Sequence, residues 1–310
     1  MSFNLFLYYC AIFGGYAALA AGLLGRAISP AQKEGSFSSG LIQTLVDGAF
    51  LGGLVALAVG LLDTLWISGL GNKTRLVTRG FGSALIGALG GILGSVITYM
   101  LIKVSGLDFL ILAGWVVTGL LIGVSLGLFD RLAALAQKQP FPQDKKIANG
   151  LLGGALGGFL GGVLFLLSKA LLGLILGKEN LISASALGFA ALGGGIGFFI
   201  GLAQVLLKDA WISVVEGKKT GKELILSKAE TLVGRSEACD VGLFGDTGVE
   251  KNHAKIIRKN NQYFLEDQGS QGGTFLNEQK IGKQSLLKSG DTFRLGQYLL
   301  RFNEKPGKRN

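Results

Sequence analysis

The sequence is poor in charge, histidine and cysteine, and each shortage excludes a class of protein. Only 16% of the 310 residues are charged, whereas soluble domains average about 25%. One histidine and two cysteines are too few for a metal cluster or a disulfide framework, and neither a P-loop nor a Gly-x-Ser-x-Gly motif occurs. We therefore expect no metal, no cofactor and no enzymatic activity. Cys10 lies in an apolar run and Cys239 in a polar region, so we expect them not to pair.

Glycine and long apolar runs dominate the chain before Lys208. Crossing the hydrocarbon core of a bilayer takes about 20 apolar residues in a helix. Six runs are long enough, near residues 5–24, 45–66, 81–102, 109–129, 151–174 and 184–207. They predict an α-helical transmembrane bundle of about six spans. Ala18-Leu19-Ala20 has the pattern of a cleavage site, so removal of the first run as a signal peptide stays open, although no basic segment precedes it.

Lysine and arginine gather in alternate links between these runs. The richest are the links after the second and fourth runs and the segment after the sixth, with Lys73, Arg75, Arg79, Arg131, Lys138, Lys145, Lys146, Lys208, Lys218 and Lys219. Cytoplasmic loops carry the excess of basic residues. We therefore expect these links and both termini in the cytoplasm, with the spans in a bacterial plasma membrane. The formal charge of +10 fits this reading, and since no nucleic-acid motif occurs, nucleic acid is not an expected partner.

Two segments recur at one common offset. GLLDTL (60–65) returns 67 residues later as GLFDRL (127–132), and IGALGGILGSV (86–96) returns at the same distance as GGALGGFLGGV (153–163). A shared offset that contains two spans predicts parallel repeats of a two-helix unit. GLAQVL (201–206) is a weaker third copy, so we expect three helical hairpins.

Every run has small residues four positions apart, as in Gly153-Gly157-Gly161. This spacing places them on one helix face, where backbones can approach closely. Tight packing or homo-oligomerisation through these faces is one interpretation, and a glycine-lined path for a small solute is the other. Charge at membrane depth, the usual mark of such a path, is scarce. Asp63 and Asp130 are equivalent in the repeat and lie at the cytoplasmic span ends, where we expect interfacial water to solvate them.

The segment from Gly234 to Asn277 has a different pattern. Apolar residues alternate with polar ones in NHAKIIRK and NQYFLED, between polar turns. This is typical of half-buried antiparallel strands. Four landmarks follow in order: Gly234-Arg235, EKNHA (250–254), GGTFLN (272–277) and GDTFRLG (290–296).

Together these motifs resemble a forkhead-associated (FHA) domain over roughly residues 223–303. The family pattern is GR, then S-R-x-H, then N-G-T-x-x-N, then a G-D-x-[IF] strand. The resemblance implies an all-β sandwich that holds phosphothreonine peptides on loops at one end. The expected organisation is a membrane domain over 1–210, a short juxtamembrane connector over 211–221 and a cytoplasmic FHA-like sandwich over 222–310.

The match is close at six positions, namely Gly234, Arg235, His253, Gly273, Thr274 and Asn277. Two positions depart from the pattern, because Glu250 stands in the place of the phosphate-binding serine and Gly272 in the place of an asparagine that holds the peptide. The resemblance implies that partners are bound by Arg235, Ser236, Glu250, Lys251, Asn252, Gly272, Gly273 and Thr274. It also implies that Gly234, His253 and Asn277 support the loops.

Arg235 is the strongest candidate for phosphate contact, since a guanidinium offers forked donors to an anion. Glu250 opposes it: a carboxylate about 5 Å from a phosphate repels it by roughly 3 kcal/mol per unit charge at an effective dielectric of about 20. The sequence leaves two interpretations open. The site is either an altered but working phosphopeptide site or a sandwich that kept its fold and lost phosphate recognition.

These observations favour a membrane-anchored adaptor or scaffold whose FHA-like domain binds a cytoplasmic protein, either unmodified or phosphorylated by a Ser/Thr kinase. The alternative is a channel or transporter subunit in which the glycine-rich bundle forms the pathway and the FHA-like tail regulates it. A continuous polar cavity in the bundle would favour the second reading, and a closed apolar core the first.

Overall fold

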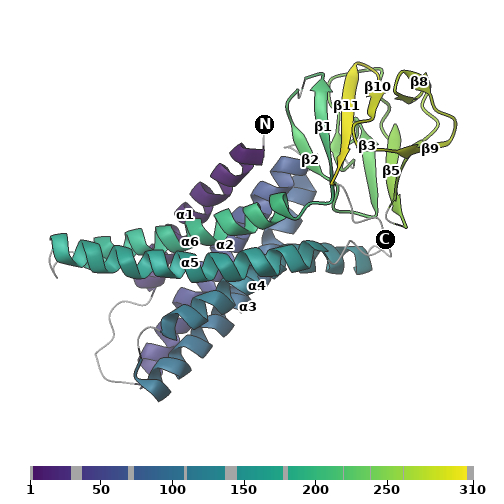
Figure 1. The fold of residues 1–310 in the computed structure, drawn as a ribbon. Helices are drawn as coiled ribbons and strands as arrows, with labels where there is room; N and C mark the ends of the chain where they lie inside the picture. The colour runs from purple at the N-terminus through teal and green to yellow at the C-terminus, as the bar shows by residue number, and fades with distance from the viewer. Residues whose placement is uncertain are drawn as a thin grey trace.

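A computed structural model describes residues 3–28, 37–68, 73–107, 110–136, 145–176, 181–218, 220–237, 239–260 and 262–305. Over these ranges the chain forms a bundle of helices with a β-sandwich at one end, and the N-terminus lies at the same end as the sandwich (Figure 1). The predicted architecture, a bundle of long apolar helices followed by an all-β domain, is confirmed.

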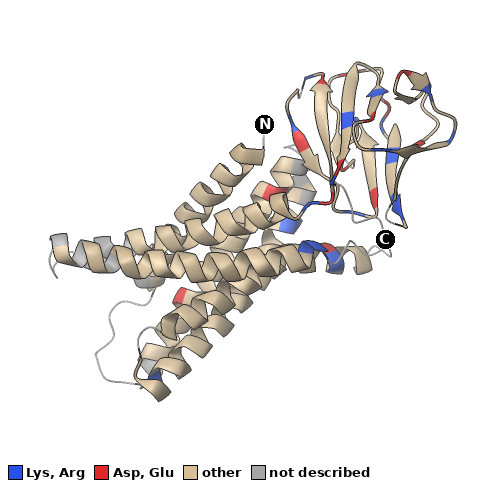
Figure 2. Ribbon diagram, viewed as in Figure 1, with Lys and Arg blue, Asp and Glu red and all other residues tan. Residues whose placement is uncertain are grey.

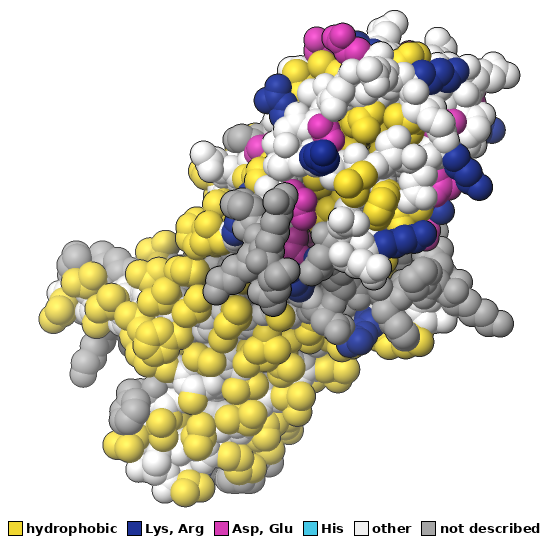
Figure 3. Space-filling view, turned by 45° about the vertical axis from the view of Figure 1, so that its right-hand side comes forward, with side chains coloured by type: hydrophobic (Ala, Val, Ile, Leu, Met, Phe, Trp, Pro, Cys, Tyr) yellow, Lys and Arg dark blue, Asp and Glu magenta, His cyan; other side chains and the backbone are white. Residues whose placement is uncertain are grey.

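The described part of the chain has six α-helices, all long and apolar enough to cross a membrane. They are α1 (Phe3–Ile28), α2 (Phe37–Ser68), α3 (Lys73–Ser105), α4 (Ile111–Ala136), α5 (Lys145–Leu176) and α6 (Leu181–Leu206). Apolar side chains cover much of the visible face of the bundle, whereas the sandwich surface is mostly polar (Figure 3). Charged residues are sparse along the helices and gather where the bundle meets the sandwich (Figure 2).

Each helix packs against the one before it, and α1 also packs against α6, so the helices close into a ring. The helix α2 additionally contacts α4 and α6 across the middle. Apolar side chains fill the centre, where Val55, Ile122 and Ile196 are each 0% exposed.

The small-residue faces bring helix backbones into direct contact. A Cβ atom added at Gly52 of α2 would strike the carbonyl oxygen of Gly87 on α3. A Cβ atom at Gly119 of α4, 67 positions later, would strike the carbonyl oxygen of Gly154 on α5, again 67 positions on. Corresponding glycines in the two proposed repeats therefore make the same contact, which supports the predicted duplication.

A third pair of this kind joins the two ends of the helical domain. A Cβ atom at Gly193 of α6 would strike the Gly14 carbonyl of α1, and one at Gly197 would strike the Cys10 carbonyl. The third unit is thus α6 with α1 and not a hairpin of consecutive helices, which corrects the expectation of three hairpins. The reason is that α1 and α6 flank the two repeated hairpins, so ring closure makes them neighbours.

The C-terminal part is a sandwich of two sheets. One described sheet has the strand order β2-β1-β11-β10-β7-β8 and the other β4-β3-β5-β6-β9. The strands are β1 (Ala210–Glu216), β2 (Glu223–Ile225), β3 (Glu230–Gly234), β4 (Val241–Gly242), β5 (Ala254–Lys259), β6 (Gln262–Asp267), β7 (Phe275–Leu276), β8 (Gln279–Lys280), β9 (Gln284–Leu287), β10 (Thr292–Leu295) and β11 (Tyr298–Glu304). Fully buried Leu265, Phe293 and Phe302 lie in the core between the sheets.

The expected connector over 211–221 is a part of the sandwich. Strand β1 covers most of it and pairs antiparallel with β11. The reason is the alternation in AWISVVE, which buries Ile212 and Val214 in the core. Since α6 ends at Leu206, the sandwich lies directly against the bundle, where the Trp66 indole donates a 3.1 Å hydrogen bond to the Glu223 carbonyl.

Candidate functional site

The turn after β3 is held against the loop before β5 by backbone contact. A Cβ atom at Gly234 would strike the carbonyl oxygen of Lys251, so only glycine fits here without a shift. The next two amides donate across the same seam, Arg235 to the Glu250 carbonyl at 2.9 Å and Ser236 to the Lys251 carbonyl at 3.0 Å. The Arg235 side chain is left exposed, with no hydrogen-bond or ion-pair partner among the described residues. It is thus available to a ligand.

His253 is fully buried between two of the predicted binding loops. Its Nδ1 accepts a 3.1 Å hydrogen bond from the Glu250 amide, so the proton is on Nε2, which lies 3.2 Å from the Gly273 carbonyl and donates to it. The neutral imidazole therefore ties the loop that carries Glu250 and Lys251 to the loop that carries Gly273.

The loop between β6 and β7 is organised by Asp267. Its Oδ1 accepts hydrogen bonds from the hydroxyls of Ser270 and Thr274, both at 2.6 Å, and its Oδ2 accepts from the amides of Gly269 and Ser270. Burial acts to raise the pKa of Asp267, but these hydrogen bonds outweigh it and hold the pKa below the usual value. Sequence reasoning missed Asp267, although an Asp followed by Gly-Ser two residues on is a recognisable Asx-turn pattern.

Asn277 lies in the turn of the β7–β8 hairpin, in a left-handed conformation with φ of 48°. Its Nδ2 donates to Asp291 Oδ1 at 2.9 Å, and its Oδ1 accepts from the Thr292 amide at 2.9 Å. Asn277 therefore positions this hairpin against the start of β10. The hydrogen bonds of Asn277 in the described residues join it to Asp291 and Thr292 and not to the residues around Arg235.

The two departures from the family pattern have different structural consequences. Glu250 is half-buried and Lys251 exposed, and the ion pairs found in the described residues do not join them. Asn252 is also exposed, and its Oδ1 lies 3.6 Å from the Cys239 thiol. Gly272 is exposed, and a Cβ atom there would meet only the Gly248 carbonyl, at 3.6 Å. The structure thus has room for a side chain at position 272, and the backbone there does not require glycine.

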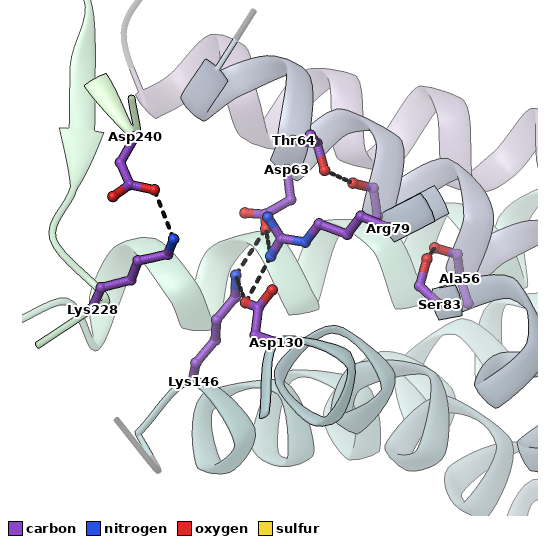
Figure 4. A network of polar contacts seen from close by, with 10 residues as sticks. Ala56, Asp63, Thr64, Arg79, Ser83, Asp130, Lys146, Lys228 and Asp240 are labelled. Carbon is purple, nitrogen blue, oxygen red and sulfur yellow. Dashed lines mark hydrogen bonds and ion pairs between the residues drawn. The ribbon is translucent and has the colours of Figure 1, made fainter. Parts of the chain in front are cut away.

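A second polar cluster lies at the end of the bundle nearest the sandwich (Figure 4). Arg79 contacts Asp63 at 2.5 Å and Asp130 at 2.9 Å, and Lys146 contacts both carboxylates at 2.9 Å. These side chains are between 4% and 19% exposed. The expectation that interfacial water solvates Asp63 and Asp130 is therefore wrong, because two buried cations neutralise them. The ion pair of Lys228 with Asp240, from the sandwich, lies next to this cluster.

The two-sheet sandwich carries an exposed arginine at the end of a strand, beside two loops that a buried histidine joins. This is the arrangement that the FHA resemblance implies. The C-terminal domain of this chain is an FHA domain. In agreement, residues 213–306 match the family model described as the inner membrane component of T3SS, cytoplasmic domain.

Curated relatives match about a quarter of the chain. The glycogen accumulation regulator GarA of Mycobacterium tuberculosis is 31% identical over 86 residues, which is 28% of this chain and 52% of GarA. The oxoglutarate dehydrogenase inhibitor of Corynebacterium jeikeium is 33% identical over 82 residues, which is 26% of this chain and 56% of that protein. The chain spans about half the length of the curated relatives it matches.

Solved structures of FHA domains also align with this region. The FHA domain of CT664 from Chlamydia trachomatis is 28% identical, with a TM-score of 0.30, and the match covers 32% of this chain and 99% of that domain. The FhaA FHA domain, solved in complex with the intracellular domain of Rv3910, is 24% identical, with a TM-score of 0.28, and covers 30% of this chain and 99% of its own.

Proposed function

We propose that this protein is a membrane-anchored adaptor that presents an FHA domain to a cytoplasmic partner protein and performs no catalysis itself. The observation that carries the proposal is the exposed guanidinium of Arg235 on a rim whose loops are fixed by Gly234 and His253. A preorganised donor next to fixed loops binds an anion without a large loss of conformational freedom.

The ligand is a segment of the partner protein that carries phosphothreonine. A Ser/Thr kinase phosphorylates this threonine. Arg235 makes the main phosphate contact, with Lys251 and Ser236 nearby, and Asn252, Gly273 and Thr274 shape the rim. Glu250 reduces the affinity because its carboxylate repels the phosphate. A partner that is not phosphorylated and offers a cation to Glu250 is the competing case.

The helical domain serves as the anchor. Its glycine faces are occupied by contacts between helix backbones and its centre by apolar side chains. These features support packing over a solute path, so the bundle is assigned no transport. The lysine-rich helix ends lie on the sandwich side of the bundle (Figure 2), which supports a cytoplasmic FHA domain and an integral plasma-membrane location.

The test uses the full chain in detergent or nanodiscs, with matched peptides that carry threonine or phosphothreonine. Some of the phosphothreonine peptides should bind the wild-type protein. Arg235→Ala should abolish this binding. Arg301→Ala, which removes an exposed arginine of β11, should leave it unchanged. Equal binding of phosphorylated and unphosphorylated peptides would contradict the phosphate requirement. Binding that is indifferent to Arg235→Ala would contradict the site itself.

A further inference from the structure

A cleft with a volume of about 50 Å³ opens between the bundle and the sandwich. Aliphatic side chains and two carboxylates contribute to its lining, together with an aromatic group and a polar group of side chains. The aromatic group consists of Phe3, Phe6 and Trp66. The polar group consists of Lys145, Lys146, Asn149, Gln204, Lys208 and Ser227.

The cleft lies at the ends of the candidate membrane spans. The second span ends at Trp66, the fifth begins at Lys145 and the sixth ends at Leu206. In the proposed membrane arrangement these positions lie at the depth of the lipid headgroups, where aromatic rings and snorkelling lysines are favoured. A ligand in this cleft would therefore have lipid on one side and the sandwich on the other.

The carboxylates that line the cleft are already neutralised by cations. Asp63 is paired with Arg79 and Lys146, as described above. Asp209, in the link between α6 and β1, accepts two hydrogen bonds from Lys145 Nζ, at 2.6 and 2.8 Å, and one from Arg258 Nη1 at 3.1 Å. An ammonium has three donors, so Lys145 and Lys146 each keep one for a ligand after these contacts.

Lys208 adds a cation that lies against two aromatic rings. Its Nζ lies 4.1 Å from the centroid of the Phe3 ring and 4.5 Å from that of Trp211. The carboxylate of Glu223 accepts a 3.1 Å hydrogen bond from the Phe3 amide, and its negative charge also acts on Lys208. Burial nevertheless lowers the pKa of Lys208, since desolvation disfavours the ammonium. An anion beside Nζ would offset this desolvation.

Gln204 supplies a further polar group to the cleft. It is only 7% exposed and lines the cleft, and its amide makes no hydrogen bond to the part of the chain that the structure describes. The amide can therefore bind a ligand in the cleft. In GLAQVL, Gln204 holds the position that Asp63 holds in GLLDTL and Asp130 in GLFDRL. The third unit thus offers a neutral amide where the others offer carboxylates, and the cleft lies beside it.

We propose that this cleft binds the phosphate headgroup of an anionic phospholipid from the leaflet that faces the sandwich. The phosphate contacts Lys145, Lys146 and Lys208 and accepts from the Gln204 amide, while the glycerol and upper acyl carbons lie against Phe3, Phe6 and Trp66. Basic pockets between helices on the cytoplasmic side suit such headgroups. This site is separate from the peptide site around Arg235.

Native mass spectrometry on the full chain tests the proposal, after exposure to micelles that contain phosphatidylglycerol and phosphatidylcholine in equal amounts. The wild type should retain phosphatidylglycerol preferentially. The Lys145→Gln/Lys208→Gln variant should bind it about thirtyfold more weakly, since each lysine near an anionic lipid contributes about fivefold in affinity. The control Lys103→Gln removes an exposed lysine from the last turn of α3, whereas the cluster beside the sandwich contains Arg79 near the start of α3. This control should leave lipid retention unchanged.

A second variant and a second ligand keep the test decisive. Ser227→Phe fills the cleft without removing a charge and should also abolish retention, which covers the case in which the double lysine variant fails to fold. Inorganic phosphate and glycerophosphate, added up to millimolar concentrations, should not raise the thermal stability as the phospholipid does. Equal retention of both lipids, no effect of either cleft variant, or stabilisation by phosphate alone would each overturn the proposal.

Discussion

The carboxylates of Asp63 and Asp130 bind the same guanidinium, that of Arg79, although they lie 67 residues apart in the chain. Lys146, which lies 67 residues after Arg79, completes the arrangement by contacting both carboxylates. Each helical unit thus supplies one acid and one base, and the pairs Arg79–Asp130 and Lys146–Asp63 cross between the units. The charges link the two units to each other as well as neutralising the bundle end.

Removing Arg79 should therefore damage the bundle more than removing a carboxylate along with it. Arg79→Gln leaves two buried carboxylates with one lysine, and we expect a loss of about 3–5 kcal/mol of stability. Adding Asp63→Asn should restore part of the lost stability, because the positive charge of Lys146 then neutralises the one remaining carboxylate, that of Asp130. Thermal unfolding in detergent measures the stability of both variants. If the stability losses of the two single substitutions simply added in the double variant, the shared network would be contradicted.

Replacing Glu250 should distinguish the two kinds of ligand. If the site binds phosphothreonine, Glu250→Ser removes a repulsion and adds a hydroxyl, with an expected gain of about 1–3 kcal/mol, or roughly tenfold to a hundredfold in affinity. If Glu250 contacts a cation of an unmodified partner, the same change weakens binding. Calorimetry on the full chain with matched peptides distinguishes the two cases by the sign of the change in binding free energy.

Two neighbouring loops offer a matched pair of glycine substitutions. Gly234→Ala places a Cβ atom on the Lys251 carbonyl and should force the loops apart, at about 1–3 kcal/mol and with loss of peptide binding. Gly272→Ala should be tolerated, since its Cβ atom meets only the Gly248 carbonyl at 3.6 Å. Gly272→Asn should then tighten a peptide ligand by adding an amide. Equal damage from both alanine variants would contradict this account of the loops.

The β6–β7 loop should weaken in acid because of Asp267. Its pKa lies below the usual 3.8 in the folded protein, so its carboxylate contributes stability above the unfolded-state value. That contribution is lost as the pH falls below about 4 and through the folded-state pKa. Hydrogen exchange of the Gly269 and Ser270 amides should rise in this range. Asp267→Asn should show a flatter pH dependence, and an unchanged profile would exclude Asp267 as the cause.

Orientation in the membrane can be read by cysteine labelling. The native Cys10 and Cys239 are both buried, so introduced thiols should dominate the signal. A reagent confined to the outside should modify Lys178→Cys, which lies outside the described residues, and miss Thr74→Cys at the start of α3. The opposite labelling pattern would reverse the proposed topology.

Short-range patterns account for what the sequence predicts well. The landmarks around Arg235, His253 and Thr274 are local loop motifs, and runs of apolar residues report the spans directly. The strand β1 was missed because a charged, glycine-containing stretch follows it, so the alternation of Ile212 and Val214 looked like a linker. Only the partner strand β11 makes that alternation meaningful.

Long-range pairings were the harder part. The repeat offset identifies Asp63 with Asp130, but their burial depends on Arg79 and Lys146 reaching across from other helices. The same offset relates the two cations and could have indicated them. No pattern within α1 indicates that its neighbour is α6, because that contact arises only when the ring closes.

That ring closure has a consequence for the order of assembly. The Gly14 face of α1 packs against α6, which is the last of the described helices to be synthesised. The helix α1 must therefore wait in the bilayer, with its small-residue face open to lipid, until the helices between it and α6 and then α6 itself are made. The FHA domain follows α6 at once, so it folds against a bundle that has just been completed.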